Sequence, residues 1–156
     1  MIGELINSGK YEAIRKKNNL PAYDEIDREF EISLLEDAPF MLRNIRRKIV
    51  EKIDFYARFL EEQLQPEPTL PLMYESKYFT EEEKAEVFKM YMKLMLICRA
   101  SVQLGVEEDD TKTSTFITKT LKEWKDMKPE LSAYIKKLRD AWKIDISIKE
   151  TLGYMG

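Results

Sequence analysis

Apolar residues recur at steps of three and four along most of this chain, and that spacing predicts helices. The clearest case is 37–65, where Asp37 before Ala38 and Pro39 is typical of a helix N-cap with proline in the first turn. One stripe of this helix is apolar: Leu42, Ile45, Ile49, Ile53, Tyr56, Leu60 and Leu64. Charged residues occupy the opposite side, so the helix is expected to bury one face.

A second long helix is predicted over 80–104. The run from Thr80 to Glu83 matches a capping box, and Gly105 is the expected end of the helix. Its wide apolar face comprises Val87, Phe88, Tyr91, Leu94, Met95, Cys98 and Val102. The run 94–98 is apolar on all sides, so we expect this turn to be the best-buried point of the molecule.

A third helix is predicted over 110–143, with Pro129 restarting or kinking it. The segment 144–156 has two readings. Ile144, Ile146 and Ile148 alternate as in a strand, whereas Ser147 and Glu150 fit a capping box. Of these we expect a short terminal segment that docks on the bundle.

Shorter elements precede and connect the long helices. One or two short helices are expected before residue 20, and Tyr23, Ile26, Phe30 and Leu34 share one face of another. Prolines make 66–79 an extended linker, whose apolar side chains should lie against the helices or else form a groove-binding peptide. The prediction is one all-α domain over 1–156, a bundle of three long antiparallel helices with short N-terminal helices.

Composition removes many kinds of chemistry. The 156 residues include no histidine and one cysteine, which excludes serine or cysteine nucleophiles activated by histidine and the common zinc sites. Cys98 is expected to be buried and inert, and no cofactor or metal is implied. Glu4 and Lys10 interrupt the amino terminus, so we expect no signal peptide and a cytoplasmic protein. The excess of Lys and Glu over Asn and Gln resembles heat-adapted proteins.

The net charge of −3 conceals two oppositely charged parts. Residues 111–149 carry ten basic and five acidic residues, whereas residues 1–110 carry 16 and 23. Four lysines lie opposite the apolar arc of the third helix: Lys112, Lys119, Lys122 and Lys125. They predict either a solvated face or a surface for nucleic acid or an acidic partner. Arg43, Arg46, Arg47, Lys48 and Lys52 form a second basic group, expected to pair within its own helix.

Three aromatic residues are interface predictions. Phe55 and Phe59 lie four apart on a flank outside the apolar stripe of their helix, so they contact either a second neighbouring helix or a partner chain. Trp142 is the third interface prediction, because an exposed tryptophan would also contact a partner chain.

Two resemblances extend these predictions. Glu82, Glu83 and Glu86 match E-E-x-x-E, and Glu107 with Asp110 match E-x-x-D, which resembles the magnesium-binding signature of all-α nucleotide pyrophosphohydrolases of the MazG type. An unbroken helix over 81–104 would separate Glu82 from Asp110 by roughly 36 Å or more, too far to share an ion. The order of a long helix, a proline linker and an acid-capped helix is similar to the helical domain of GINS replication subunits.

The leading functional prediction is a non-enzymatic helical interaction or scaffold protein, either a homo-oligomer or a small subunit of a larger assembly. Its basis is the absence of a catalytic constellation, the doubly apolar helix and the separated charge. The alternative is a nucleic-acid-associated subunit, in a replication or ribonucleoprotein complex, that uses the lysine face. The third prediction is a magnesium-dependent nucleotide pyrophosphohydrolase of the MazG type.

Overall fold

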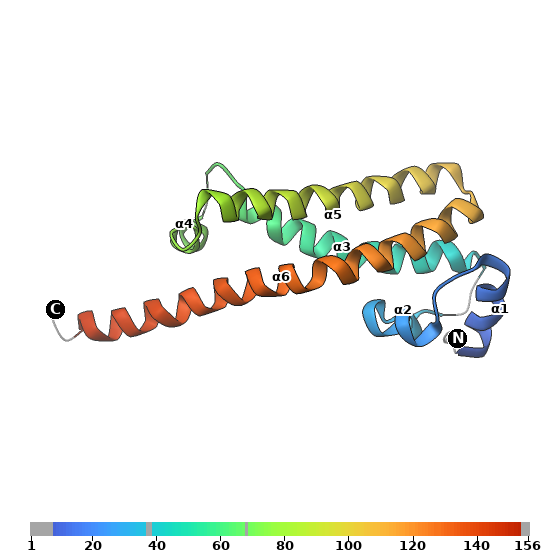
Figure 1. Ribbon diagram of the computed structural model, residues 1–156, viewed down its shortest axis with the longest axis horizontal. Helices are drawn as coiled ribbons and strands as arrows, with labels where there is room; N and C mark the ends of the chain where they lie inside the picture. The colour runs from blue at the N-terminus through green and yellow to red at the C-terminus, as the bar shows by residue number, and fades with distance from the viewer. Residues whose placement is uncertain (1–7, 37–38, 68, 154–156) are drawn as a thin grey trace.

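The computed structural model describes residues 8–36, 39–67 and 69–153, with the backbone alone described over 144–153 (Figure 1). The helices are α1 (Ser8–Asn18), α2 (Tyr23–Phe30), the short 3₁₀ helix η1 (Ile32–Leu34), α3 (Met41–Gln63), α4 (Leu70–Ser76), α5 (Glu81–Glu107) and α6 (Asp110–Gly153). The all-α prediction is confirmed, and the described residues contain no strand.

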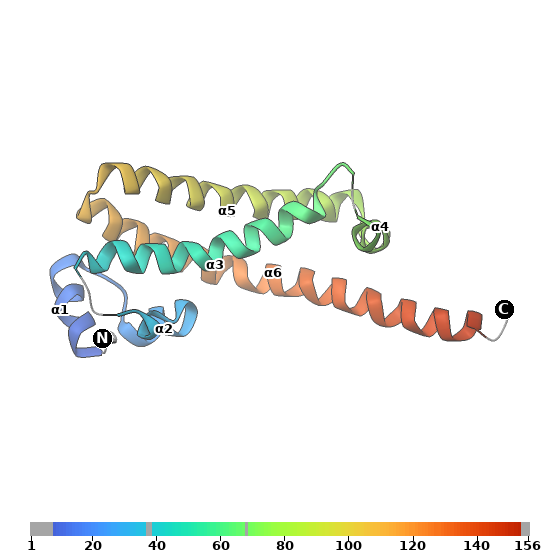
Figure 2. The same cartoon turned by 180° about the vertical axis from the view of Figure 1, so that it is seen from behind.

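The three long helices pack side by side, and successive ones run in opposite directions (Figures 1 and 2). α3 contacts both α5 and α6, so its apolar stripe lies at the centre of the core. Ile45, Ile49, Ile53 and Leu60 of that stripe are fully buried, as predicted. At one end of the bundle, α1 lies beside the starts of α3 and α6, and α2 packs against α3 and residues 124–128 of α6 (Figure 2).

The start of α3 differs from the prediction. Asp37 and Ala38, the expected N-cap region, lie outside the described residues. The helix begins at Met41, after Phe40 in the left-handed conformation at φ 63°. Phe40 carries no side-chain acceptor for the first amides, so among the described residues this end of α3 has no side-chain cap.

In α5 the capping box is confirmed, because the Thr80 hydroxyl accepts from the Glu83 amide at 3.1 Å and the Glu83 carboxylate accepts from the Thr80 amide at 3.2 Å. Gly105 does not end the helix. The chain leaves it at Glu108, in the left-handed conformation at φ 57°, with its amide bonded to the Leu104 carbonyl. The expected deep burial of 94–98 is also wrong, because Leu96 is 72% exposed.

The predicted linker contains α4, so it is not extended throughout. Pro71 suits the first turn of a helix, where its missing amide proton is not needed. The Tyr74 hydroxyl donates to the Ala141 carbonyl at 2.7 Å, and Phe79 packs against Tyr134. Leu70 remains 80% exposed, so the expected packing against the helices holds for part of the segment.

α6 is one helix of 44 residues that neither restarts nor ends at Pro129. Proline removes one internal hydrogen bond, and buried side chains on both sides, Met127 and Leu131, hold the adjoining turns against the core. The helix continues to Gly153, so 144–153 does not fold back as a separate docking segment; residues 154–156 lie outside the described part. Both views show its end extending past the bundle (Figures 1 and 2).

The N-terminal prediction is correct in part. α1 is a short helix before residue 20, as predicted, and Ile26 and Phe30 of α2 are buried as their spacing indicates. Leu34 is 60% exposed, because Glu31 at φ 56° ends α2 and η1 takes the chain in a new direction.

Candidate interaction surfaces

The predicted lysine face of α6 is largely paired with carboxylates. Lys112 contacts Glu107 at 2.9 Å, and Lys119 contacts Glu123 at 3.8 Å. Lys125 contacts Glu25 of α2 at 2.5 Å. These pairs neutralise much of the charge that would attract a phosphate backbone.

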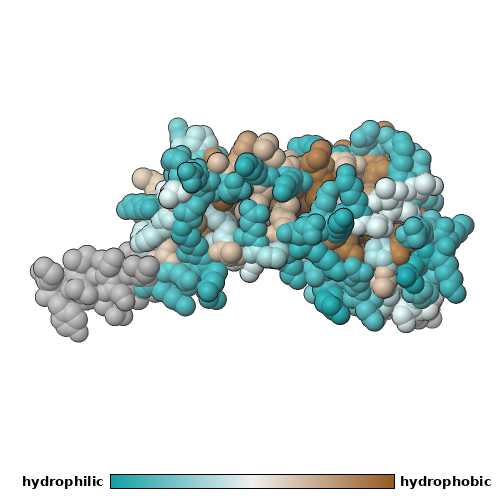
Figure 3. All heavy atoms as spheres, viewed as in Figure 1, coloured by the Kyte–Doolittle hydropathy of each residue, from teal (hydrophilic) through white to brown (hydrophobic). Residues whose placement is uncertain are grey.

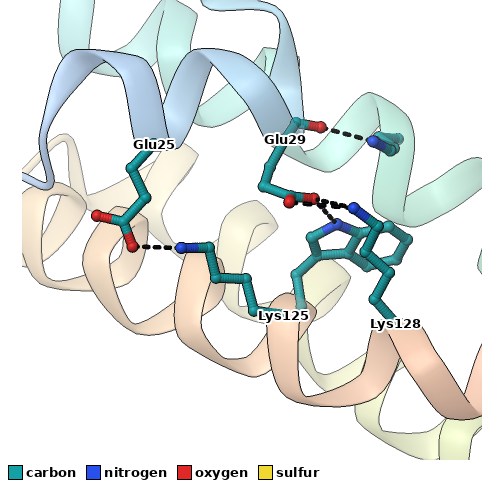
Figure 4. Close-up of polar contacts among 6 residues, drawn as sticks. Glu25, Glu29, Lys125 and Lys128 are labelled. Carbon is teal, nitrogen blue, oxygen red and sulfur yellow. Dashed lines mark hydrogen bonds and ion pairs between the residues drawn. The ribbon is translucent and has the colours of Figure 1, made fainter.

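Next to Lys125, α6 binds α2 through a buried carboxylate (Figure 4). Glu29 is 5% exposed and accepts hydrogen bonds from Trp124 Nε1 at 2.9 Å and from Lys128 Nζ at 3.1 Å. On the other side, Lys52 Nζ donates to the Glu29 carbonyl at 2.5 Å and lies over the Trp124 ring. Glu29 therefore joins α2 to both α3 and α6.

The electrostatics of this contact favour the ionised carboxylate. Burial by itself would raise the pKa of Glu29, but the hydrogen bonds from Lys128 and Trp124, together with the charges of Lys128 and Lys52, lower it below 4.5. Burial lowers the pKa of Lys52, and the charge of Glu29 partly opposes that change. The arrangement is a structural ion pair that holds α2 against α6.

A groove of about 570 Å³ lies between the C-terminal end of α1 and the first turns of α6. Its wall includes Lys17, Lys119 and Lys122 and the hydroxyl groups of Thr111 and Thr118. Within the described part of the chain, Lys17 and Lys122 form no ion pair. Two of the groove's lysines thus present unneutralised charge to one polar depression.

The three predicted interface aromatics do not share one surface. Phe55 is 63% exposed, Phe59 packs partly against the core, and Trp142 is half-buried. Trp142 Nε1 donates to Glu75 at 3.1 Å, so this ring anchors α4 to α6. Phe55 lies near Trp124, because both rings contact Tyr56. Trp142 follows Trp124 by 18 residues, which is roughly 27 Å along the helix, so Trp142 is far from Phe55.

The outer side of α5 is apolar and faces solvent. Its exposed apolar side chains lie opposite the face that packs on α3: Phe88 (48%), Met92 (49%), Leu96 (72%), Val102 (61%) and Val106 (82%). Figure 3 shows apolar atoms gathered along the edge that α5 forms. We refer to these five residues as the outer α5 patch. The sequence placed Phe88 and Val102 on the wide apolar face of this helix, but it did not show which part of that face the bundle leaves open.

The acidic residues of the pyrophosphohydrolase-like pattern are not brought together. Glu83 binds Lys137, and Glu107 binds Lys112 and accepts from Gln103 at 3.0 Å. Glu82, Glu83 and Glu86 line a shallow depression at the start of α5, while Glu107 and Asp110 lie at its other end. In the described part of the chain, no group of three or more such side chains is placed to hold a metal ion.

Arg46 departs from the expected pairing within α3. Its side chain is 5% exposed and donates from one terminal nitrogen to the carbonyl of Ser101 and to its hydroxyl, the latter at 3.1 Å. Its Nε is buried without a hydrogen-bond partner. Burial lowers the pKa of Arg46, and the neighbouring charges of Arg47 and Arg43 lower it further. Helical spacing could have identified this arginine, because Arg46 lies four residues after Leu42 and three before Ile49 on the buried face, whereas Arg47 lies on the exposed side.

Comparisons with known proteins do not define a class for this chain. No protein-family model, curated protein or solved structure matches it. Among the described residues, none of the helices combines the length and apolarity needed to cross a bilayer.

Proposed function

We propose that this chain is a non-enzymatic helical interaction protein that binds a partner helix on the outer α5 patch, either as a homo-oligomer or as a small subunit of a larger assembly. The supporting observation is the patch itself, five exposed apolar side chains on one long helix. Several exposed apolar side chains on one side of a helix are typical of a binding site, whereas singly scattered ones are normal on a protein surface. An apolar stripe on a helix is complementary to the stripe of another amphipathic helix.

A photo-crosslinking experiment tests the proposal. A benzophenone amino acid replaces Met92 in the native host, and the same residue replaces exposed Lys136 of α6 as a matched control. We expect a discrete covalent adduct from position 92 and none from position 136. Adding Leu96→Lys should abolish the adduct with an unchanged circular dichroism spectrum, because Leu96 is 72% exposed. Absence of any adduct from position 92 would contradict the proposal.

The groove between α1 and α6 favours a second function, association with nucleic acid. Lys17, Lys119 and Lys122 converge on one polar depression, as contacts to phosphates require. The test is fluorescence anisotropy with single- and double-stranded oligonucleotides at two salt concentrations. Binding should weaken steeply with salt and with the pair Lys119→Glu and Lys122→Glu. Binding that is affected neither by salt nor by the two lysine substitutions would rule this function out.

A further inference from the structure

The outer face of α5 carries a heptad pattern that includes most of the outer α5 patch. The intervals between successive members alternate strictly between four and three: Glu81, Ala85, Phe88, Met92, Met95, Arg99, Val102 and Val106. We call these residues the α5 seam. All of them are exposed except Met95, which is half-buried. Apart from Met95, which packs partly against the core, the pattern therefore lies on the solvent side of the helix.

A repeat of seven residues specifies the geometry of the partner. Side chains spaced by 3.5 residues stay in line only when two helices wind around each other with a left-handed twist. The seam extends over more than three heptads, roughly 37 Å of helix. The occupant that suits it is therefore a long helix lying nearly parallel or antiparallel to α5, rather than an extended strand or a small ligand.

The two charged members of the seam select the occupant. Arg99 forms no ion pair within the described part of the chain, and Glu81 contacts exposed Lys84 at 3.4 Å. A parallel second copy would place Arg99 against Arg99, a like-charge contact at the centre of the interface. An antiparallel copy centred on position 90 instead places Arg99 of each chain opposite Glu81 of the other.

The same register matches the apolar members. In this register, the numbers of two residues that face each other across the pair add to 180. Phe88 of one copy therefore faces Met92 of the other, and the small Ala85 faces the large Met95. Lys89 flanks the centre of this pair, and Glu86 neutralises it at 3.0 Å. Val102 and Val106 extend past the overlap toward the end of the second copy that carries α4, where Leu70 and Met73 are exposed.

We infer that a second copy of this chain docks antiparallel on the α5 seam, with Arg99 of each copy bound to Glu81 of the other. This inference rests on the proposed function and names its partner. The overlapping part of the seam, residues 81–99, is short, so the dimer is expected at the weak end of specific association, with dissociation in the micromolar range.

Charge exchange across the pair tests the inference by sedimentation velocity between 1 and 200 µM, a range chosen around that affinity. The wild-type chain should dimerise, and Arg99→Glu or Glu81→Arg should each weaken the dimer at least about tenfold. The double variant should regain most of the affinity. An equimolar mixture of the two single variants should form a heterodimer, because each brings the charge that the other lacks. Glu62→Arg, an exposed change on α3, is the control and should have no effect.

Two results would overturn the inference. A wild-type chain that stays monomeric at 200 µM excludes the second copy, and a dimer that charge exchange does not restore excludes this register. Failure here is distinguishable from failure of the proposed function. If position 92 crosslinks to a different chain while the protein is monomeric, the outer α5 patch still binds a helix and the inference alone is wrong.

Discussion

Glu29 shows how one residue can join three helices. Its side chain accepts from Trp124 and Lys128 of α6, and its carbonyl accepts from Lys52 of α3. A buried carboxylate without such donors would be strongly destabilising, so the burial of the Glu29 side chain depends on Trp124 and Lys128. The sequence alone could not reveal this contact, because residues 29 and 124 are 95 positions apart and the pattern of α2 indicates only which face is buried.

Replacing Glu29 by Gln should lower the free energy of unfolding at pH 7 by about 2–4 kcal/mol, because the Lys128 ammonium and the Trp124 indole N–H lose their charged acceptor. The pKa of Glu29 is lower in the folded chain than in the unfolded chain, so its contribution is fully present above the unfolded pKa and is lost as pH falls through the folded value. Urea denaturation at pH 7 and pH 3 checks this. The difference between wild type and variant should shrink at pH 3.

Glu25→Gln is the matched control, since Glu25 forms a solvent-exposed pair with Lys125 on the same two helices (Figure 4). A surface pair contributes little, so we expect a loss of no more than about 1 kcal/mol. Equal losses for the two variants would show that burial of Glu29 has no special role.

Arg46 makes a second prediction. A buried guanidinium without a carboxylate partner carries an uncompensated desolvation cost, and an apolar side chain of similar length can fill its space. Arg46→Met should therefore leave the free energy of unfolding unchanged or raise it by up to about 2 kcal/mol. Chemical denaturation measures the change, and a loss above 2 kcal/mol would show that the bonds to Ser101 outweigh the desolvation cost.

At the scale of elements, periodicity predicted which helices exist better than where they end. The stripe of α3 and the Thr80 capping box rest on side chains near in sequence, and both are seen in the structure. The ends of α5 and α6 depend on tertiary contacts: Gly105 continues α5 beside the Arg46 guanidinium, and Pro129 continues α6 between buried turns. The outer α5 patch was not predicted. Phe88 and Val102 were assigned to the apolar face of this helix but are exposed, because a wide apolar face does not show which of its residues the neighbouring helices cover.

Pro129 offers a prediction at this scale. It is exposed and lies inside α6, where it removes one backbone hydrogen bond and costs about 3 kcal/mol relative to alanine in an unconstrained helix. Pro129→Ala should raise the free energy of unfolding by about 1–3 kcal/mol. Thermal and urea unfolding followed by circular dichroism measure it, with exposed Glu130→Ala as the neutral neighbour. An unchanged free energy of unfolding in Pro129→Ala would mean that the helix has already relaxed around the proline.

At the scale of the whole molecule, the all-α prediction was correct because the apolar spacing is helical along most of the chain. The arrangement of charge was harder to predict. The basic excess of 111–149 suggested an open lysine face, yet α2 and neighbouring turns of α5 and α6 supply carboxylates to much of it. Charge counted along a sequence does not show which acids fold back onto which lysines.

The end of α6 makes the final prediction. Its backbone extends past the bundle (Figure 2), so a chain that stops after Lys143 should retain its free energy of unfolding to within about 0.5 kcal/mol. Urea denaturation compares the two chains. As a control, stopping after Ile135 removes Ala141 and Trp142, which hold α4, and should destabilise the protein clearly.

The long separation between Glu29 and Trp124 also has a kinetic consequence. Pairing of α3 with α5 and of α5 with α6 can begin between helices that follow each other in the chain, whereas α2 meets α6 only after a loop of about 95 residues has closed. The last step of folding should then be the docking of α2 on α6, since α2 can already contact α3, which follows it closely in the chain. Trp124 lies at that contact, so its fluorescence reports this step without any added label.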